Sequence, residues 1–211
     1  MEGLDLLKKD WNRQDKNQKH LSQNEIYPML HKKSSSIVKT LFYISVAELI
    51  FWILINTIPL FTSIEYREKL NMVYGSPFIF TAINILSYGI ILLFIYLLFK
   101  SHQAISVTDN AKKLMKSILK TRKIIKYYVL YNLTLAFIAM SIGFYFGLTK
   151  NPEIASKLYK ITNSEKLIML SIVLISTAIF VFIIWIFYKL IYGLLLKRLN
   201  QNYKELKKIE I

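Results

Sequence analysis

The chain has 211 residues, 54% of them hydrophobic, and its 28 basic residues against 13 acidic ones give a net charge of +15. The apolar residues collect into four long blocks and the charges lie almost wholly between them, which excludes an ordinary water-soluble fold because such a fold scatters charges along each element. The absence of cysteine excludes disulfides, thiol nucleophiles and thiolate metal sites.

Each apolar block is long enough to cross a bilayer as a helix, since a hydrocarbon core of roughly 30 Å needs about 20 residues. We therefore predict an all-α polytopic membrane protein, a four-helix transmembrane bundle with amphipathic cytoplasmic helices. The first block begins after residue 36 and lacks a cleavage pattern, so we expect it to remain as a true span. The predicted segments are a cytoplasmic N-terminal segment 1–36, spans 37–61, 78–99, 124–148 and 167–190, external loops 62–77 and 149–166, a basic cytoplasmic helix 100–123, and a cytoplasmic C-terminal helix 191–211.

Lysine and arginine are distributed unevenly across the predicted membrane. The two terminal segments and the central loop hold 22 of them, and the two other connections hold 6. Because short basic loops stay on the cytoplasmic side, both termini are expected in the cytoplasm of a cell with this protein in its inner membrane. The same placement explains the net charge without nucleic acid, and no recognition motif accompanies it, so we expect the lipid bilayer as a partner and no nucleic acid.

The N-terminal segment carries an amphipathic pattern. Leu4, Leu7 and Trp11 lie at helical spacing and form a candidate docking face for a lipid surface or a cytoplasmic protein. A second helix start is predicted at Ser22, with Glu25 completing a capping box, and Pro28 predicts either a kink or a later start.

Glu48 is the one acidic residue within the four predicted spans. It shares a stripe with Ser45, Trp52 and Asn56, which we expect to face the bundle interior. As a functional group Glu48 would carry a proton or cation, and as a structural group it would be a hydrogen-bond anchor. The anchor is favoured, because a transport cycle usually needs more than one such group.

Three polar residues on the neighbouring spans complete the candidate intramembrane site. Asn84 and Tyr88 on the second span or Asn132 on the third are the predicted hydrogen-bond partners of Glu48. With Asn56, the two asparagines would line a polar path if the protein were a transporter or channel.

Small residues mark the third span. Ala139, Gly143 and Gly147 recur every four residues, a spacing that lets another helix approach closely, either within the bundle or in a homo-oligomer. In the loop before this span, Ser106 and Asp109 are predicted to cap a helix whose apolar face includes Val107, Leu114 and Leu119.

Two patterns concern the fourth span. Thr162 and Glu165 form a predicted capping box at its start. At its end an apolar stripe predicts that the helix continues past the membrane, through Leu195, Leu199, Tyr203, Leu206 and Ile209.

Two pairs of similar segments raise the hypothesis of an internal duplication. Residues 37–39 match residues 124–126 at an offset of 87, and residues 95–100 match residues 184–189 at an offset of 89. The alternative is that apolar helices ending in an aromatic residue and a lysine resemble one another by composition alone.

Catalytic patterns are missing from the sequence. His20, His31 and His102 lie outside the spans and form no metal-binding spacing, and the sequence has no nucleophile elbow or phosphate loop. We therefore expect no enzyme, no cofactor and no metal site.

Three stretches of the chain, residues 31–39, 114–123 and 202–208, resemble a family of small four-span membrane proteins from Bacteroidetes, some of which carry the name beta-carotene monooxygenase. The resemblance implies the four-span fold. An iron oxygenase looks to require a cluster of histidines, which the three histidines of this chain do not provide.

The leading hypothesis is a non-enzymatic scaffold or regulatory protein whose cytoplasmic helices dock a partner. A proton- or cation-coupled transporter or channel using Glu48 is the alternative, and an intramembrane enzyme comes third.

Overall fold

The structure, a computed structural model, describes residues 23–74, 77–108, 110–150 and 162–209. These ranges contain no strand and form five helices: α2 (Gln23–Thr62), α3 (Ile64–Tyr74), α4 (Pro77–Ser106), α5 (Ala111–Lys150) and α7 (Asn163–Ile209). All except α3 are long and apolar enough to cross a membrane. The prediction of an all-α, multi-pass membrane protein is confirmed.

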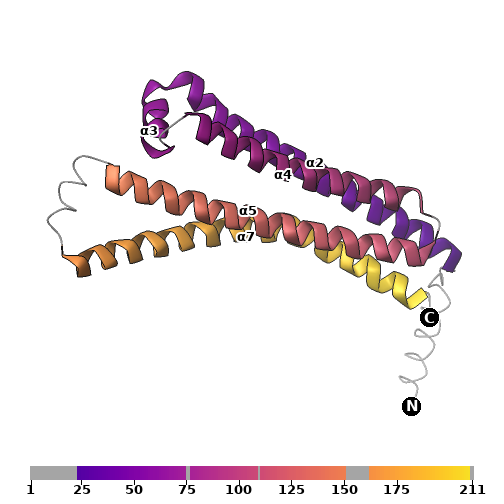
Figure 1. The fold of residues 1–211 in the computed structure, drawn as a ribbon. Coiled ribbons are helices and arrows are strands. Elements are labelled where there is room, and N and C mark those ends of the chain that lie inside the picture. The colour runs from indigo at the N-terminus through magenta and orange to yellow at the C-terminus, as the bar shows by residue number, and fades with distance from the viewer. Residues whose placement is uncertain (1–22, 75–76, 109, 151–161, 210–211) are drawn as a thin grey trace, which may run out of the picture.

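The long helices form two antiparallel hairpins, α2 with α4 and α5 with α7 (Figure 1). Because α2 also contacts α7 and α4 contacts α5, each helix has two neighbours in a four-helix bundle. The hairpins lie close together near the C-terminus and separate toward α3 (Figure 1). We call these the basic end, formed by residues 23–36, 101–106, 111–123 and 195–209, and the α3 end.

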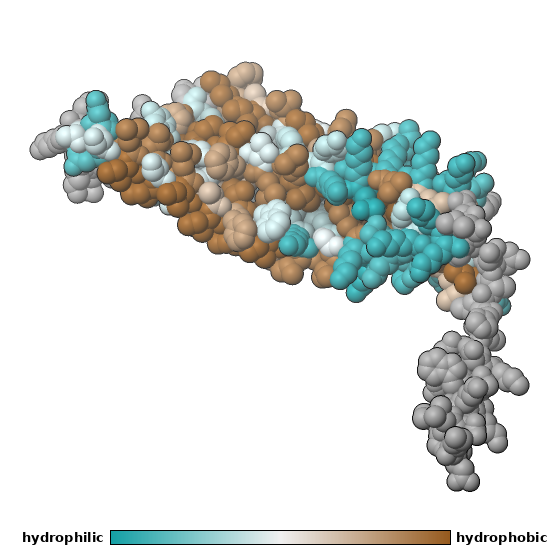
Figure 2. Space-filling view, turned by 90° about the horizontal axis from the view of Figure 1, so that it is seen from below, coloured by the Kyte–Doolittle hydropathy of each residue, from teal (hydrophilic) through white to brown (hydrophobic). Residues whose placement is uncertain are grey.

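The best-packed core lies toward the basic end. The apolar side chains with no exposed surface are Val38, Leu41, Leu98, Ile105, Leu114, Ile118, Ile125, Tyr128, Leu199 and Leu206. In the most apolar window of each long helix, by contrast, at most 17% of the residues are buried. Figure 2 shows the division on one face, with hydrophilic residues gathered over the basic end and hydrophobic ones over most of the remaining length. An apolar surface of this extent requires lipid around it.

The helices are longer than a bilayer is thick. α2 and α5 have 40 residues each, or about 60 Å at the usual helical rise, against a hydrocarbon core of roughly 30 Å. The bundle therefore continues into water, and the buried core and charged surface at the basic end identify that end as a water-exposed part.

The start of α5 differs from the prediction. The loop helix and the third span are one continuous helix that begins at Ala111, and its cap is Asn110. The Asn110 side-chain oxygen accepts hydrogen bonds from the backbone N–H groups of Lys112 at 2.8 Å and Lys113 at 3.4 Å. An asparagine at this position satisfies amide donors that the first helical turn leaves unpaired.

The predicted cap at Ser106 is wrong, because Ser106 is the last residue of α4 and donates to the Gln103 carbonyl at 2.9 Å. Asp109 lies outside the described residues. Of the predicted apolar face, Leu114 is buried in the core, whereas Val107 precedes the helix with 79% of its surface exposed and Leu119 is 43% exposed.

For the fourth helix, the predicted capping box and the continuation of the helix beyond the fourth apolar block are confirmed. The Glu165 carboxylate accepts from the Thr162 backbone N–H at 2.7 Å, and the Glu165 N–H lies 3.5 Å from the Thr162 hydroxyl. At its other end α7 runs to Ile209, with Leu199 and Leu206 fully buried.

At the start of the described chain, α2 begins at Gln23, so Pro28 lies inside the helix and the predicted later start is wrong. The expected cap Ser22 and the candidate docking residues Leu4, Leu7 and Trp11 lie outside the described residues.

The pattern of burial supports an internal duplication, with one of the two offsets revised. At the predicted offset of 87, buried Ser34, Ile37, Val38 and Leu41 of α2 match buried Thr121, Ile124, Ile125 and Tyr128 of α5.

For the second helices of the two hairpins, the offset of 89 is wrong, because it pairs Leu98, fully buried, with Phe187, 67% exposed. An offset of 101 instead matches buried Ile91, Leu98, Ser101 and Ile105 to buried Tyr192, Leu199, Asn202 and Leu206. The offset is larger for the second helices because α7 begins at Asn163, 15 residues before the position that matches Pro77, the first residue of α4.

Candidate functional site

Three tyrosine hydroxyls converge on the carboxylate of Glu48. Tyr128 of α5 and Tyr192 of α7 each donate to Oε2 at 2.8 Å, and Tyr188 of α7 donates to Oε1. The Ser45 hydroxyl lies 3.3 Å from the Tyr192 hydroxyl and joins the same group. These five side chains, which we call the Glu48 cluster, link α2 to both helices of the second hairpin.

The direction of the helices brings α2 and α7 side chains together. Cα–Cβ bonds tilt toward the N-terminus of a helix, so Glu48 leans toward the basic end and Tyr188 and Tyr192, on an antiparallel helix, lean the opposite way. Tyr188 and Tyr192 are four residues apart and share one face of α7. The carboxylate therefore meets two hydroxyls from successive turns.

Aromatic rings enclose the cluster. Tyr188 and Tyr192 are stacked at 5.6 Å between ring centroids, and Tyr128 meets Tyr192 edge-on at 5.8 Å. Phe94 of α4 packs edge-on against Tyr128 at 5.8 Å. Because Phe94 adds α4 to the contacts from α2, α5 and α7, all four long helices contribute to the surroundings of the Glu48 carboxylate.

The hydrogen bonds to Glu48 offset part of the cost of placing its charge in a membrane. A charge in the membrane interior costs about 2.5 to 3.5 kcal/mol on insertion scales. Three hydrogen bonds of about 0.6 kcal/mol each, the average between membrane helices, return about 2 kcal/mol. These hydrogen bonds thus offset more than half of the cost, and they hold α2 in one register against α5 and α7.

The predicted partners of Glu48 lie elsewhere. Asn56, Asn84 and Asn132 each donate a side-chain hydrogen bond to the carbonyl four residues earlier in their own helix, at 2.8, 2.9 and 3.0 Å. The Tyr88 hydroxyl is buried, has no partner within hydrogen-bond geometry among the described residues, and neighbours Asn56 rather than Glu48. A single polar path through Glu48 and the three asparagines is not assembled.

The stripe on α2 faces the interior over part of its length. Ser45 is fully buried, but Trp52, two turns further on, is 38% exposed. The stripe leaves the core where the two hairpins separate, so the expectation of an inward face holds only near the basic end.

We did not predict that Tyr128, Tyr188 and Tyr192 would contact Glu48, because aromatic residues near lysines are typical of a membrane boundary. Such residues do exist: Lys39 lies over the Tyr43 ring at 5.9 Å, and Lys123 lies over the Tyr127 ring at 5.8 Å. The signal that could have separated the two groups was the four-residue spacing of Tyr188 and Tyr192, opposite the lone acid of the spans.

Polar contacts also tie the helices together at the basic end. The Asn202 amide donates to the Ser34 hydroxyl at 3.0 Å, and the hydroxyls of Ser101 and Thr121 are 2.9 Å apart. The two bonds occupy matching positions in the duplicated hairpins, since Ser34 corresponds to Thr121 and Asn202 to Ser101. Each therefore joins one hairpin to the other.

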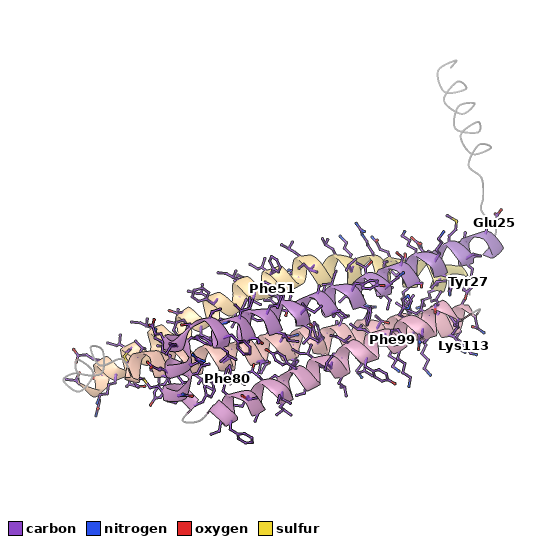
Figure 3. All side chains as sticks on the ribbon, turned by 90° about the horizontal axis from the view of Figure 1, so that it is seen from above. Glu25, Tyr27, Phe51, Phe80, Phe99 and Lys113 are labelled. Carbon is purple, nitrogen blue, oxygen red and sulfur yellow. The ribbon has the colours of Figure 1, made fainter. Side chains whose placement is uncertain are left out.

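Two further bonds close the end of α4. The Tyr27 hydroxyl donates to the Thr108 carbonyl at 3.0 Å, and His31 Nε2 lies 2.6 Å from the Ile105 carbonyl. At the end of a helix the last carbonyls have few backbone donors, and Ile105 accepts a long bond of 3.4 Å from the Thr108 N–H, so the α2 side chains add donors there. Tyr27 and Lys113, far apart in sequence, accordingly lie at the same end of the bundle in Figure 3.

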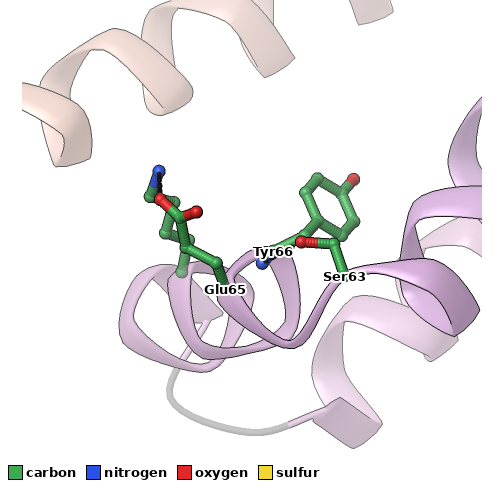
Figure 4. A network of polar contacts seen from close by, with 4 residues as sticks. Ser63, Glu65 and Tyr66 are labelled. Atoms are coloured by element: carbon green, nitrogen blue, oxygen red, sulfur yellow. Dashed lines mark hydrogen bonds and ion pairs between the residues drawn. The ribbon is translucent and has the colours of Figure 1, made fainter.

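At the opposite end, α3 occupies the first predicted external loop. The Ser63 hydroxyl caps it by accepting from the Tyr66 backbone N–H at 3.1 Å, and Lys69 pairs with Glu65 at 2.6 Å (Figure 4). The hydrogen bond and charge of Lys69 lower the pKa of the Glu65 carboxyl below its ordinary value. Both groups are exposed, so the pair stabilises little.

With this geometry in place, the chain can be compared with known proteins. The family described as "Domain of unknown function (DUF8845)" matches residues 24–211. The chain belongs to this family. No characterised protein and no solved structure matches it.

The family match spans the four long helices, including the Glu48 cluster and the basic end. The description of the family names no activity, so the chemistry of these sites rests on their residues. Within the described ranges, no group of three or more His, Asp or Glu side chains could hold a metal ion.

The small-residue face of α5 lies away from the other helices. A Cβ atom added to Gly143 or Gly147 would meet nothing within 4 Å, and Ala139 is exposed. Of the two predicted uses of this face, packing inside the bundle is therefore wrong. The homo-oligomer stays a prediction.

Proposed function

We propose that this protein is a non-enzymatic scaffold or regulatory protein of a bacterial inner membrane, with its basic end in the cytoplasm as a platform for a partner protein. The observation that carries the proposal is the construction of that end. Four helix ends share a fully buried core that includes Leu114, Ile118 and Leu206, and polar bonds such as Asn202 to Ser34 fix their register. A rigid, water-exposed surface is what a docking platform needs.

Charge indicates the kind of partner. The exposed face of α5 at the basic end carries Lys112, Lys113, Lys116 and Lys120. Complementary charge speeds association and selects among partners, so the expected partner presents an acidic surface.

Affinity capture of the full chain from native membranes tests the platform. The test variant reverses charge at Lys112, Lys113 and Lys116, and the matched control reverses Arg67 and Lys69 at the α3 end together with exposed Lys166. We expect the test variant to lose a cytoplasmic protein that the wild type and the control retain. An unchanged set of captured proteins after both this change and deletion of residues 2–20 would contradict the proposal.

Orientation has its own test, made simple by the absence of native cysteine. Single cysteines at Lys207 and Lys69 probe the basic end and the α3 end. In intact cells a membrane-impermeant maleimide should label Lys69→Cys alone, and lysis should expose Lys207→Cys. The reverse pattern would place the basic end outside.

Proton or cation transport through Glu48 is the second candidate. The buried hydroxyls of Tyr88 and Thr177 have no hydrogen-bond partner among the described residues. They favour transport, because unsatisfied polar groups between helices are suited to a passing ion or water. Against it, Glu48 already holds three donors. A Glu48→Gln variant that lowers proton or cation flux in proteoliposomes would favour transport over the scaffold.

We do not extend to this chain the oxygenase name that some members of the resembled Bacteroidetes family carry. An iron oxygenase looks to require a cluster of several histidine ligands, and the chain has only His20, His31 and His102, far apart in sequence.

A further inference from the structure

A cavity of about 540 Å³ opens beside the seam between α2 and α7 at the basic end. Its lining is Met29, Lys32, Lys33, Ser36, Ile37 and Arg198. The volume lies within the range of small-molecule sites.

The α2 side of the cavity is a single helical stripe. Its five residues follow one another at spacings of three, one, three and one, which places them on one face. Arg198 reaches in from α7 and completes the opposite wall. The bond between Asn202 and Ser34 lies one turn away and holds the two walls in register.

Charge makes the cavity an anion site. Lys32, Lys33 and Arg198 are exposed, and none of them forms an ion pair with a described carboxylate. The described acids nearest in sequence are Glu25, a full turn before Met29, and Glu205, seven residues after Arg198. Guanidinium and ammonium groups facing one small space bind phosphate well, the former through paired hydrogen bonds.

The position of the cavity relative to the membrane indicates which kind of phosphate compound it would bind. Lys39, which lies over the Tyr43 ring, follows Ser36 by one turn and marks the membrane boundary on α2. Beyond it, α7 exposes Leu190 and Leu194, each more than half uncovered. An acyl chain has an apolar path along the helices directly below a basic headgroup site.

We propose that this cavity binds the headgroup of an anionic phospholipid, with Lys32, Lys33 and Arg198 around the phosphate and Ser36 donating a hydrogen bond. Basic pockets between transmembrane helices are suited to such headgroups. The site is independent of the scaffold proposal and would operate equally in a transporter.

The experiment measures lipid binding to the full chain in neutral detergent by native mass spectrometry, with phosphatidylglycerol, phosphatidylcholine and inorganic phosphate as probes. We expect one phosphatidylglycerol to be retained per chain. The variant Lys32→Gln, Lys33→Gln, Arg198→Gln should weaken this binding about 100-fold, from roughly fivefold for each cation near a membrane surface.

A matched control removes the same charges elsewhere at the basic end, as Lys113→Gln, Lys116→Gln, Arg122→Gln, and should change binding less than about 10-fold. The thermal midpoints of both variants check folding, and a variant with Lys32→Arg and Lys33→Arg should retain binding. Equal losses in test and control, or equal binding of phosphatidylcholine, would overturn the site. Inorganic phosphate binding as tightly as the lipid would overturn the lipid as its occupant.

Discussion

The two ends of the bundle are made from the same four helices yet are built differently. At the basic end side chains such as Ile118 and Leu199 are wholly enclosed and polar groups bond between helices. Toward the α3 end side chains such as Leu174 and Phe182 remain exposed, and the asparagines bond within their own helices. Water drives apolar side chains into a core, and lipid does not, so the solvent around each end determines its packing.

The largest expected effect is a difference in stability between substitutions at the two ends of α7. Leu199→Ala should lower the free energy of unfolding in detergent by about 2 to 5 kcal/mol, because it opens a cavity in a closed core. Leu174→Ala, at a side chain that is 44% exposed, should cost well under 1 kcal/mol. Equal losses would mean that the α3 end is packed as tightly as the basic end.

The Glu48 cluster lies where the tightly packed basic end meets the more exposed part of the bundle, so its variants test the boundary between the two. Replacing Tyr128, Tyr188 and Tyr192 together by phenylalanine should cost about 2 kcal/mol, since the carboxylate loses its donors. Adding Glu48→Leu should recover most of the loss, because an apolar partner removes the unsatisfied acid. Tyr96→Phe, at an exposed tyrosine, is the control and should be silent. Failure of the added leucine to restore the unfolding midpoint would refute the anchor role.

Asparagines at the two ends should respond unequally. Asn202→Ala removes a buried bond to Ser34 between helices and should lower stability by about 1 kcal/mol. Asn84→Ala removes a bond to the Phe80 carbonyl of its own helix and should change stability by less than about 0.5 kcal/mol. Chemical unfolding of both variants in the same detergent provides the measurement, and a larger loss for Asn84 would contradict the assignment.

The smallest expected effect concerns the α3 end alone. Because Lys69 lowers the pKa of Glu65, the pair should stabilise α3 at neutral pH and lose that stabilisation as pH falls through the lowered value. NMR titration of the Glu65 side chain should show this pKa returning to its ordinary range in Lys69→Met. An unchanged titration would mean that the pair does not form.

The predictable parts of the fold were those written in local patterns. Apolar blocks revealed the spans, and the contacts of Thr162 with Glu165 needed only a spacing of three along the chain. Burial of Leu199 and Leu206 followed from a helical stripe that continues beyond the fourth block.

The unpredicted parts depend on register between helices. Which hydroxyls reach Glu48 is decided by how α2 slides against α7, and Tyr188 lies 140 residues away in the chain. The start of α5 was missed for a local reason, since Ser106, Asp109 and Asn110 are all good caps and the competition among them is resolved by where α4 ends.

An internal duplication of the hairpins, which the burial pattern supports, would have a consequence for the origin of the Glu48 cluster. Applying the two offsets to Glu48, Tyr128, Tyr188 and Tyr192 leads to Leu135, Leu41, Ser87 and Ile91, none of which is an acid or a tyrosine. If the gene arose by fusion of two identical copies, the Glu48 carboxylate and its tyrosine donors were acquired after the fusion. They have no counterpart at the matching positions. A reconstructed ancestor with two equivalent halves would be expected to pair its hairpins interchangeably. In the present chain the Glu48 cluster makes the two hairpins different.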